Sequence, residues 1–184
     1  MRVIAGSARS LKLVTPRSDA TRPTTDRIKE TLFNMLQFDL ADAAFLDLFA
    51  GSGGIGIEAL SRGAKRCVFV DSDKEAGICI TQNLEHTRLA DKGEYLKQDT
   101  FVALQMLEYK ETFDIVFMDP PYGQELERRV LEYLTMSTIV NADSLIIFEA
   151  DIKTDISYLD ALGYELVKEK IYKTNKHVFV RRKR

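Results

Sequence analysis

Short apolar stretches alternate along this chain with longer stretches in which apolar residues recur every three or four positions. Most of the apolar stretches are rich in β-branched and aromatic residues, which predicts buried strands at 44–49, 66–70, 94–97, 113–118 and 144–148. The helical periodicity predicts helices at about 25–38, 57–62, 74–89, 100–109, 124–135 and 154–162. Strands that alternate with helices form βαβ units, so we expect an α/β fold with a mostly parallel sheet.

Both ends of the chain have a different pattern, the alternation of apolar and polar residues that is typical of hairpins. Residues 164–172 and 177–182 predict a final hairpin, which adds an antiparallel pair at one edge and brings the sheet to seven strands. Runs at 2–5 and 11–15 predict a small N-terminal β-hairpin. We therefore expect a hairpin-and-helix extension over residues 1–38 and one α/β domain over residues 39–184.

A glycine-rich turn follows the first predicted strand and precedes a predicted helix. Gly51, Gly53 and Gly56 have the spacing of the dinucleotide-binding fingerprint, in the strand-to-helix context that gives this fingerprint its meaning. Asp71 lies twenty residues after Gly51, at the end of the next strand, where a carboxylate can hold ribose hydroxyls. The pattern predicts an adenosine-containing cofactor, but by itself it does not separate a nicotinamide cofactor from S-adenosylmethionine.

Carboxylates at successive strand ends favour S-adenosylmethionine. Asp47 comes four residues before Gly51, Asp99 ends the third strand and Asp119 ends the fourth. Because these ends meet at one edge of a parallel sheet, the carboxylates would build a site for a cationic sulfonium and an amine acceptor. Hydride transfer would need a proton donor or a substrate domain, and the chain has no room left for a large one.

The segment Asp119-Pro120-Pro121-Tyr122 ends an apolar strand, which the prolines stop because they lack an N–H donor. Asp119 and the Pro120 carbonyl can each accept one N–H bond from an amine on a flat ring. Two such acceptors favour a nitrogen lone pair aimed at an electrophile. Tyr122 can stack on the ring face. We therefore predict that Asp119, Pro120 and Tyr122 are catalytic.

Composition limits the remaining possibilities. With 184 residues, 45% of them hydrophobic and 29% charged, the chain can bury a real core and is most simply one domain. No apolar run approaches the ~18 residues of a membrane span, and no signal peptide follows Met1. Cys67 and Cys79 lack CxxC spacing, and His86 and His177 lie far apart in sequence. We expect a cytoplasmic protein with no metal site and no membrane partner.

The net charge of -2 hides basic ends on an acidic body. Residues 1–35 carry seven Lys/Arg against three Asp/Glu, and residues 168–184 carry eight Lys/Arg against one Glu. Such ends fit an RNA phosphate surface, and they fit a solubilising tail equally well. Under the first interpretation, the candidate RNA contacts are Arg9, Lys12, Arg22, Arg27, Lys173, Lys176 and Arg181.

These motifs carry a family resemblance that covers nearly the whole chain. The stretch from Asp47 to Gly56 resembles the S-adenosylmethionine motif of Rossmann-like class I methyltransferases, and Asp119–Tyr122 resembles the (D/N)PP(Y/F) motif of amino-group methyltransferases. Residues 2–6 and 22–34 resemble the RsmD family. Members of that family methylate N2 of a guanine in bacterial small-subunit ribosomal RNA.

The resemblance implies S-adenosylmethionine as the cofactor and 16S rRNA, free or within a small subunit, as the partner. It also implies the cofactor-binding residues, which are Asp47, Gly51, Ser52, Gly53, Gly56, Asp71, Asp99 and Thr100. The same tetrapeptide serves adenine-N6 and cytosine-N4 methylation of DNA and glutamine methylation in proteins, so these acceptors remain alternatives. A non-catalytic nucleotide-binding module is the alternative of another class.

Overall fold

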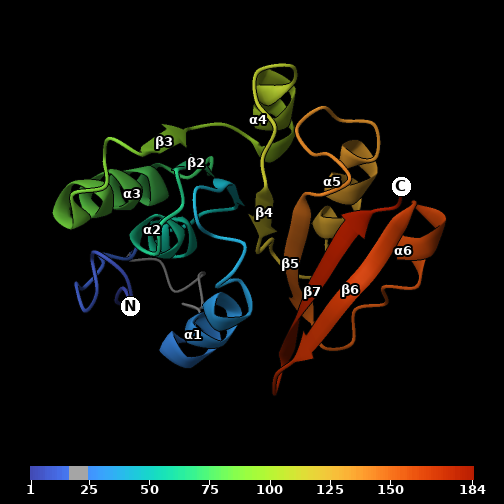
Figure 1. Ribbon diagram of the computed structural model, residues 1–184, viewed down its shortest axis with the longest axis horizontal. Coiled ribbons are helices and arrows are strands. Elements are labelled where there is room, and N and C mark those ends of the chain that lie inside the picture. Colours follow the sequence, from blue (N-terminus) through green and yellow to red (C-terminus); the bar gives the residue numbers. More distant parts are fainter. Residues whose placement is uncertain (17–24) are drawn as a thin grey trace.

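A seven-stranded sheet with the strand order β3-β2-β1-β4-β5-β7-β6 forms the centre of the molecule in the computed structural model (Figure 1). The structure describes residues 1–16 and 25–184. The strands are β1 (Ala44–Leu48), β2 (Arg66–Val70), β3 (Gly93–Leu96), β4 (Ile115–Met118), β5 (Leu145–Asp151), β6 (Tyr164–Ile171) and β7 (Asn175–Arg182). Strands β1 to β5 pair in parallel, and β7 pairs antiparallel with both β5 and β6. The predicted parallel sheet with an antiparallel edge hairpin is confirmed.

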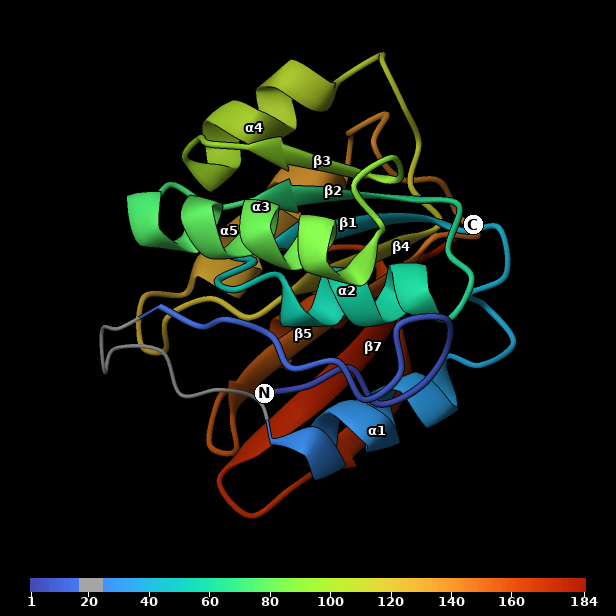
Figure 2. The ribbon, with the colours of Figure 1, turned by 90° about the vertical axis from the view of Figure 1, so that its left-hand side faces the viewer.

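Helices cover both faces of this sheet. They are α1 (Asp26–Met35), α2 (Gly54–Ser61), α3 (Lys74–Thr87), α4 (Thr100–Leu107), α5 (Leu126–Leu134) and α6 (Tyr158–Ala161). Figures 1 and 2 show α1, α2 and α3 on one side of the sheet and α5 on the other. Within the described ranges, no helix is both long and apolar enough to cross a membrane.

The double cover explains why the central strands are continuously apolar. Phe45 packs into the cluster formed with α1, α2 and α3, whereas the next residue, Leu46, packs into the cluster formed with α4, α5 and α6. Successive side chains of a strand point to opposite faces, so both positions must be apolar. The same alternation separates Ile147 from Phe148 in β5.

Two predicted helices and the N-terminal hairpin differ from the structure. Helix α2 begins at Gly54 rather than at residue 57, because the turn already ends at Gly53, which is left-handed with φ +76°. Helix α6 is only Tyr158–Ala161, since Asp155 accepts the Ser157 N–H and forms a turn there. The hairpin is reduced to one isolated antiparallel bridge, between Arg2 and Lys12.

The N-terminal segment packs on α2 instead of extending a sheet. The Glu58 carboxylate accepts the backbone N–H groups of Ile4 (2.8 Å) and Ala5 (3.0 Å). Val3 and Phe33 lie in the same hydrophobic cluster as Ile57 of α2. Residues on both sides of position 38 therefore share one core.

Candidate active site

A cavity of about 700 Å³ lies at the edge of the sheet where the parallel strands end. Its wall combines the glycine turn after β1, Asp71 after β2 and the Asp119–Tyr122 segment after β4. The start of antiparallel β7 lies at the same edge, because Asp151 of β5 is in register with Asn175. Further lining residues come from the N-terminal segment, α1, the end of β5 and the β6–β7 loop; they include Met1, Thr15, Ile28, Lys29, Glu149, Tyr172, Lys173 and Thr174.

The three glycines of the turn have different structural roles. Gly51 adopts φ +56°, lines the cavity, and has no atom within 4 Å of the place where a Cβ would stand. Gly56 faces away from the cavity, and a Cβ there would lie 2.3 Å from the Phe69 ring. Gly51 therefore leaves room for a ligand, whereas Gly56 lets α2 pack closely on β2. Gly53, with φ +76°, supplies the left-handed residue before α2.

Two of the predicted carboxylates hold this turn in place. The Asp71 carboxylate accepts the Gly51 N–H at 2.8 Å, and Asp47, which is buried, accepts the Gly56 N–H at 2.9 Å. Burial raises the pKa of Asp47 to about 7, against the lowering effect of the Gly56 hydrogen bond. Both residues and Ser52 line the cavity.

Asp99 and Thr100 do not belong to the wall of this cavity. Asp99 is the N-cap of α4, and its carboxylate accepts the N–H groups of Phe101 (2.9 Å) and Val102 (3.4 Å). Thr100 is buried as the first residue of α4. Their predicted contact with an adenine stays a prediction.

A further carboxyl group at the cavity wall belongs to Asp119. Within residues 1–16 and 25–184 it takes part in no hydrogen bond and no ion pair, although it lines the cavity and is partly buried. Burial, followed by the nearby carboxylates of Glu149 and Asp47, raises the pKa of Asp119 to about 8. A group in this state can accept hydrogen bonds from a bound amine. Pro120, which is buried, and Pro121, which is exposed, complete the strand end.

Sequence reasoning missed Glu149, which organises the acceptor side of the cavity. Its carboxylate accepts hydrogen bonds from the Tyr122 hydroxyl (2.8 Å) and from Asn175 Nδ2 (2.6 Å), and pairs with His177 Nε2 (3.1 Å). Burial alone would raise the pKa of Glu149, but the contacts with His177, Tyr122 and Asn175 outweigh burial and lower it. One signal was available, because Glu149 lies at the carboxyl end of a parallel strand, like Asp119.

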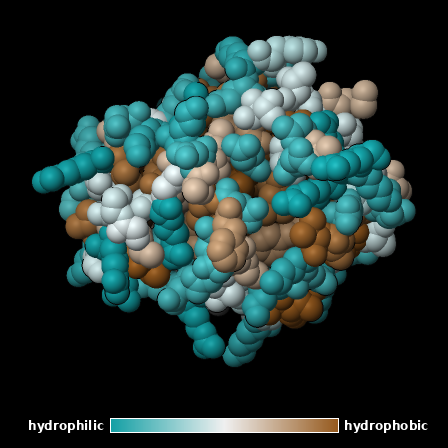
Figure 3. Space-filling view, viewed as in Figure 1, coloured by the Kyte–Doolittle hydropathy of each residue, from teal (hydrophilic) through white to brown (hydrophobic). Residues whose placement is uncertain are grey.

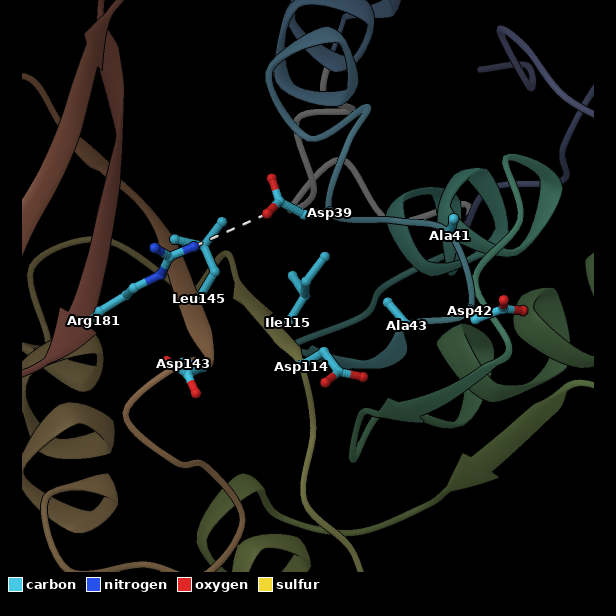
Figure 4. A pocket seen from close by; sticks show the side chains of 9 residues that line it. All are labelled: Asp39, Ala41, Asp42, Ala43, Asp114, Ile115, Asp143, Leu145 and Arg181. Carbon is cyan, nitrogen blue, oxygen red and sulfur yellow. Dashed lines mark ion pairs between the residues drawn. The ribbon is translucent and has the colours of Figure 1, made fainter.

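Most of the C-terminal candidates for RNA binding form ion pairs or lie away from the cavity. Lys176 is buried and pairs with Glu169 at 2.9 Å. Arg181 lies at the opposite edge of the sheet, because β7 runs antiparallel, and it points toward Asp39 with 3.9 Å between Nη2 and Oδ1 (Figure 4). Lys173 is exposed and lines the cavity. Of these three predicted RNA contacts, the structure brings Lys173 to the cavity wall.

Three of the N-terminal candidates, Arg9, Lys12 and Arg27, are exposed. For Arg9, Lys12 and Arg27, the part of the chain that the structure describes contains no ion-pair partner. Arg22 lies outside the described residues. Most of the surface seen in Figure 3 is hydrophilic, so exposed polarity alone does not single out an RNA-binding face.

A second cavity, of about 320 Å³, lies at the amino ends of β1, β4 and β5. Figure 4 shows the residues that line it, which are Asp39, Ala41, Asp42, Ala43, Asp114, Ile115, Asp143, Leu145 and Arg181. Its carboxylates are not grouped as metal ligands. No set of three or more His, Cys, Asp or Glu side chains within the described ranges could hold a metal ion.

The sheet order, the glycine turn and the Asp-Pro-Pro-Tyr segment facing it across one cavity define a class I methyltransferase, whose methyl donor is S-adenosylmethionine. Within this class, the chain belongs to the RsmD family. The family profile described as Conserved hypothetical protein 95 matches residues 1–181.

Relatives in the family align with most of the chain. The Ribosomal RNA small subunit methyltransferase D of Haemophilus influenzae is 35% identical over 171 residues, which cover 92% of this chain and 88% of the relative. The protein of the same name from Escherichia coli is 35% identical over 172 residues, covering 93% and 84%. The solved structure of yhhF from Escherichia coli is 32% identical, has a TM-score of 0.87, and covers 100% of this chain and 98% of its own.

Proposed function

We propose that this protein transfers a methyl group from S-adenosylmethionine to the exocyclic N2 amine of a guanine in small-subunit ribosomal RNA. The observation that carries the proposal is the carboxylate of Asp119, which has no partner among the described residues and shares one cavity with the glycine turn. The names of the relatives that are 35% identical support ribosomal RNA as the substrate. The family resemblance of the N-terminal segment supports guanine N2.

The cofactor side of the cavity suits a cationic adenosine derivative. Gly51 leaves open space beside the turn, and Asp71 lies where ribose hydroxyls are held in this fold. Bound S-adenosylmethionine would supply an electrophilic methyl group on a sulfonium. Asp47, Asp71 and Asp119 line the same cavity, and a cation bound among them would lower the raised pKa values of Asp47 and Asp119 and be stabilised by their ionised carboxylates.

On the acceptor side, Asp119 and the Pro120 carbonyl accept the two N–H groups of the amine, which aims the nitrogen lone pair across the cavity. Tyr122 is 49% exposed and offers its ring to the base. No strong general base is required, because the amine becomes acidic as it is methylated. Positioning and electrostatics therefore supply most of the rate enhancement.

The test is transfer of labelled methyl groups to ribosomal RNA and to small subunits from cells that lack the modification, followed by nucleoside analysis. We expect N2-methylguanosine as the labelled product. N6-methyladenosine would instead support the alternative reading of the tetrapeptide, and label in protein would exclude an RNA substrate.

The variant Asp119→Ala provides the mechanistic control. It should largely abolish transfer, because the amine loses its acceptor, while calorimetric titration with S-adenosylhomocysteine should give a dissociation constant within a few-fold of wild type. An equal loss of cofactor binding would mean that Asp119 contacts the cofactor and not the acceptor amine.

A further inference from the structure

Among the described residues, a single hydrogen bond holds the side chain of Tyr122. Tyr122 belongs to an exposed loop that continues into Gly123, which has φ +77°. Across the described residues, the only polar contact of its side chain is the 2.8 Å hydrogen bond from its hydroxyl to Glu149 Oε1. Burial first, and then this contact with Glu149, raises the pKa of Tyr122, so the phenol keeps its proton and acts as the donor.

Glu149, by contrast, is held firmly by the sheet. It pairs with His177 across the β5–β7 ladder, and its side chain is only 10% exposed. Asn175 Nδ2 and His177 Nε2 fix its two oxygens at 2.6 and 3.1 Å. His177 is fully buried, lies 3.2 Å from the Tyr172 hydroxyl through Nδ1, and packs edge-on against Phe117.

We propose that Glu149 is a positioning residue of methyl transfer, which holds the Tyr122 ring in its stacking orientation through the phenol hydroxyl. The inference rests on the proposed function, because it assumes that a base stacks on Tyr122. A rigid carboxylate on the sheet thereby sets the orientation of an aromatic ring on an exposed loop. A hydrogen bond to an ionised acceptor is stronger than one between neutral groups, so the charge of Glu149 matters.

If Glu149 positions the ring, the Tyr122 hydroxyl contributes to the rate of methyl transfer. Stacking alone needs only the ring, so a phenylalanine would suffice if nothing else held residue 122. In this chain, Tyr122→Phe would release the ring and leave Glu149 with one donor fewer. Glu149→Gln would weaken the same contact from the other side, because it removes the charge and turns an amide N–H₂ toward donors. The two substitutions should therefore damage one and the same interaction.

A double-mutant cycle in single-turnover methyl transfer tests this, with saturating cofactor and varied RNA concentration. Tyr122→Phe and Glu149→Gln should each lower the maximal rate about tenfold, and the double variant should be no slower than the slower single variant. The dissociation constant of S-adenosylhomocysteine should stay within about twofold. A product of the two single effects, about a hundredfold, or a single variant at the wild-type rate, would overturn the proposal.

Two matched controls separate positioning from a general loss of hydrogen bonds. Tyr164→Phe removes a buried hydroxyl that donates to the Leu131 carbonyl at 2.7 Å, away from the cavity. Glu108→Gln alters a carboxylate that accepts bonds from Ser137 and Thr138, also away from the cavity. Both should keep the wild-type rate, whatever they do to the melting temperature.

NMR of protein labelled at tyrosine Cζ gives a readout that does not depend on turnover. The chain has seven tyrosines, and the Tyr122 signal is the one that disappears in Tyr122→Phe. In Glu149→Gln this signal should shift, as should that of Tyr172, whose hydroxyl lies against His177, the partner of Glu149. The signals of the other tyrosines should stay in place, and an unmoved Tyr122 signal would overturn the contact. If wild-type protein methylates no RNA amine, the proposed function itself fails, a result distinct from normal methylation with independent variants.

Discussion

At the scale of single residues, the site depends on the Asp119 carboxylate, which finds no hydrogen-bond partner in residues 1–16 and 25–184. Desolvation at the partly buried cavity wall, followed by the nearby carboxylates of Glu149 and Asp47, raises the pKa of Asp119 to about 8. Unfolded chains hold aspartate at a pKa of about 3.9. Between these two values the folded protein binds more protons than the unfolded chain, so the contribution of Asp119 to stability falls as the pH rises from about 4 to about 8.

Asp119→Asn should remove this pH-dependent penalty. We expect the variant to melt several degrees above wild type at pH 9, and the difference to shrink toward zero below about pH 3, where wild-type Asp119 is protonated in both states. Thermal unfolding across this pH range measures it. If the two proteins keep a constant difference at every pH, Asp119 titrates normally and the site is more open than its burial implies.

Sequence alone located the carboxylates but not their partners. Strand-end reasoning found Asp47, Asp71 and Asp119 at the cavity, because a parallel sheet brings those ends together. It could not find that Asp99 caps α4, since a capping aspartate and a ligand-binding aspartate have the same local pattern. The link from Tyr122 to Glu149 was out of reach, because it depends on the register of β4 with β5 and on the course of the exposed loop after β4.

At the scale of an element, two glycines of the turn between β1 and α2 have different roles. Gly56 allows close packing in the core, and Gly51 leaves space for a ligand. A Cβ at Gly56 would lie 2.3 Å from the Phe69 ring and 2.6 Å from Cys67 Sγ, both in the core, whereas a Cβ at Gly51 would enter open space beside the cavity. The fingerprint predicted that glycines were needed but not which demand each one serves.

Gly56→Ala should therefore destabilise the fold by about 1–3 kcal/mol, as overpacked cores do, while the folded fraction still binds S-adenosylhomocysteine within a few-fold. Gly51→Ala should cost about 1 kcal/mol for its left-handed backbone and weaken cofactor binding at least tenfold, because its methyl group projects toward the ligand. Urea unfolding measures the stability of both variants, and calorimetric titration measures their affinity for S-adenosylhomocysteine. Identical behaviour of the two variants would contradict these different roles.

The N-terminal segment is anchored by a buried ion pair. Lys29 of α1 and Glu58 of α2 have no exposed side-chain surface, and Lys29 Nζ lies 3.3 Å from Glu58 Oε2 and 2.5 Å from the Arg2 carbonyl. Burial lowers the pKa of Lys29, against the raising effect of Glu58. Glu58 has a second cationic partner, Arg62 Nε at 2.8 Å.

That asymmetry predicts unequal effects of removing each partner. Glu58→Ala strands a buried ammonium and releases the segment, so we expect a loss of about 3–5 kcal/mol. Lys29→Met keeps the volume and leaves Glu58 paired with Arg62, so it should cost much less. Urea titration gives the free energy of unfolding of both variants. Equal losses would mean that Lys29 and Glu58 contribute through packing and not through their charges.

At the scale of the whole molecule, hydrophobic patterning predicted the sheet well because each central strand is covered on both faces. Charge counting predicted the RNA surface less well, because a count does not reveal which charges the fold uses. Arg182 donates to the carbonyls of Leu134, Thr135, Ser137 and Val140. Lys183 and Arg184 pair with Asp160 and Asp143. Much of the basic C-terminus therefore contacts other parts of the protein itself.

The same accounting selects Lys173 as the C-terminal residue to test for RNA binding. It is exposed at the cavity wall, whereas Lys176 is paired with Glu169 and Arg181 lies at the opposite edge of the sheet. A contact with one phosphate contributes about 0.7–0.9 to the slope of log affinity against log salt. Lys173→Gln should reduce the slope by about that amount, with cofactor affinity unchanged. Lys176→Gln and Arg181→Gln, which remove the same charge, should leave the slope intact; an equal reduction in all three would mean that RNA responds to net charge rather than to a site.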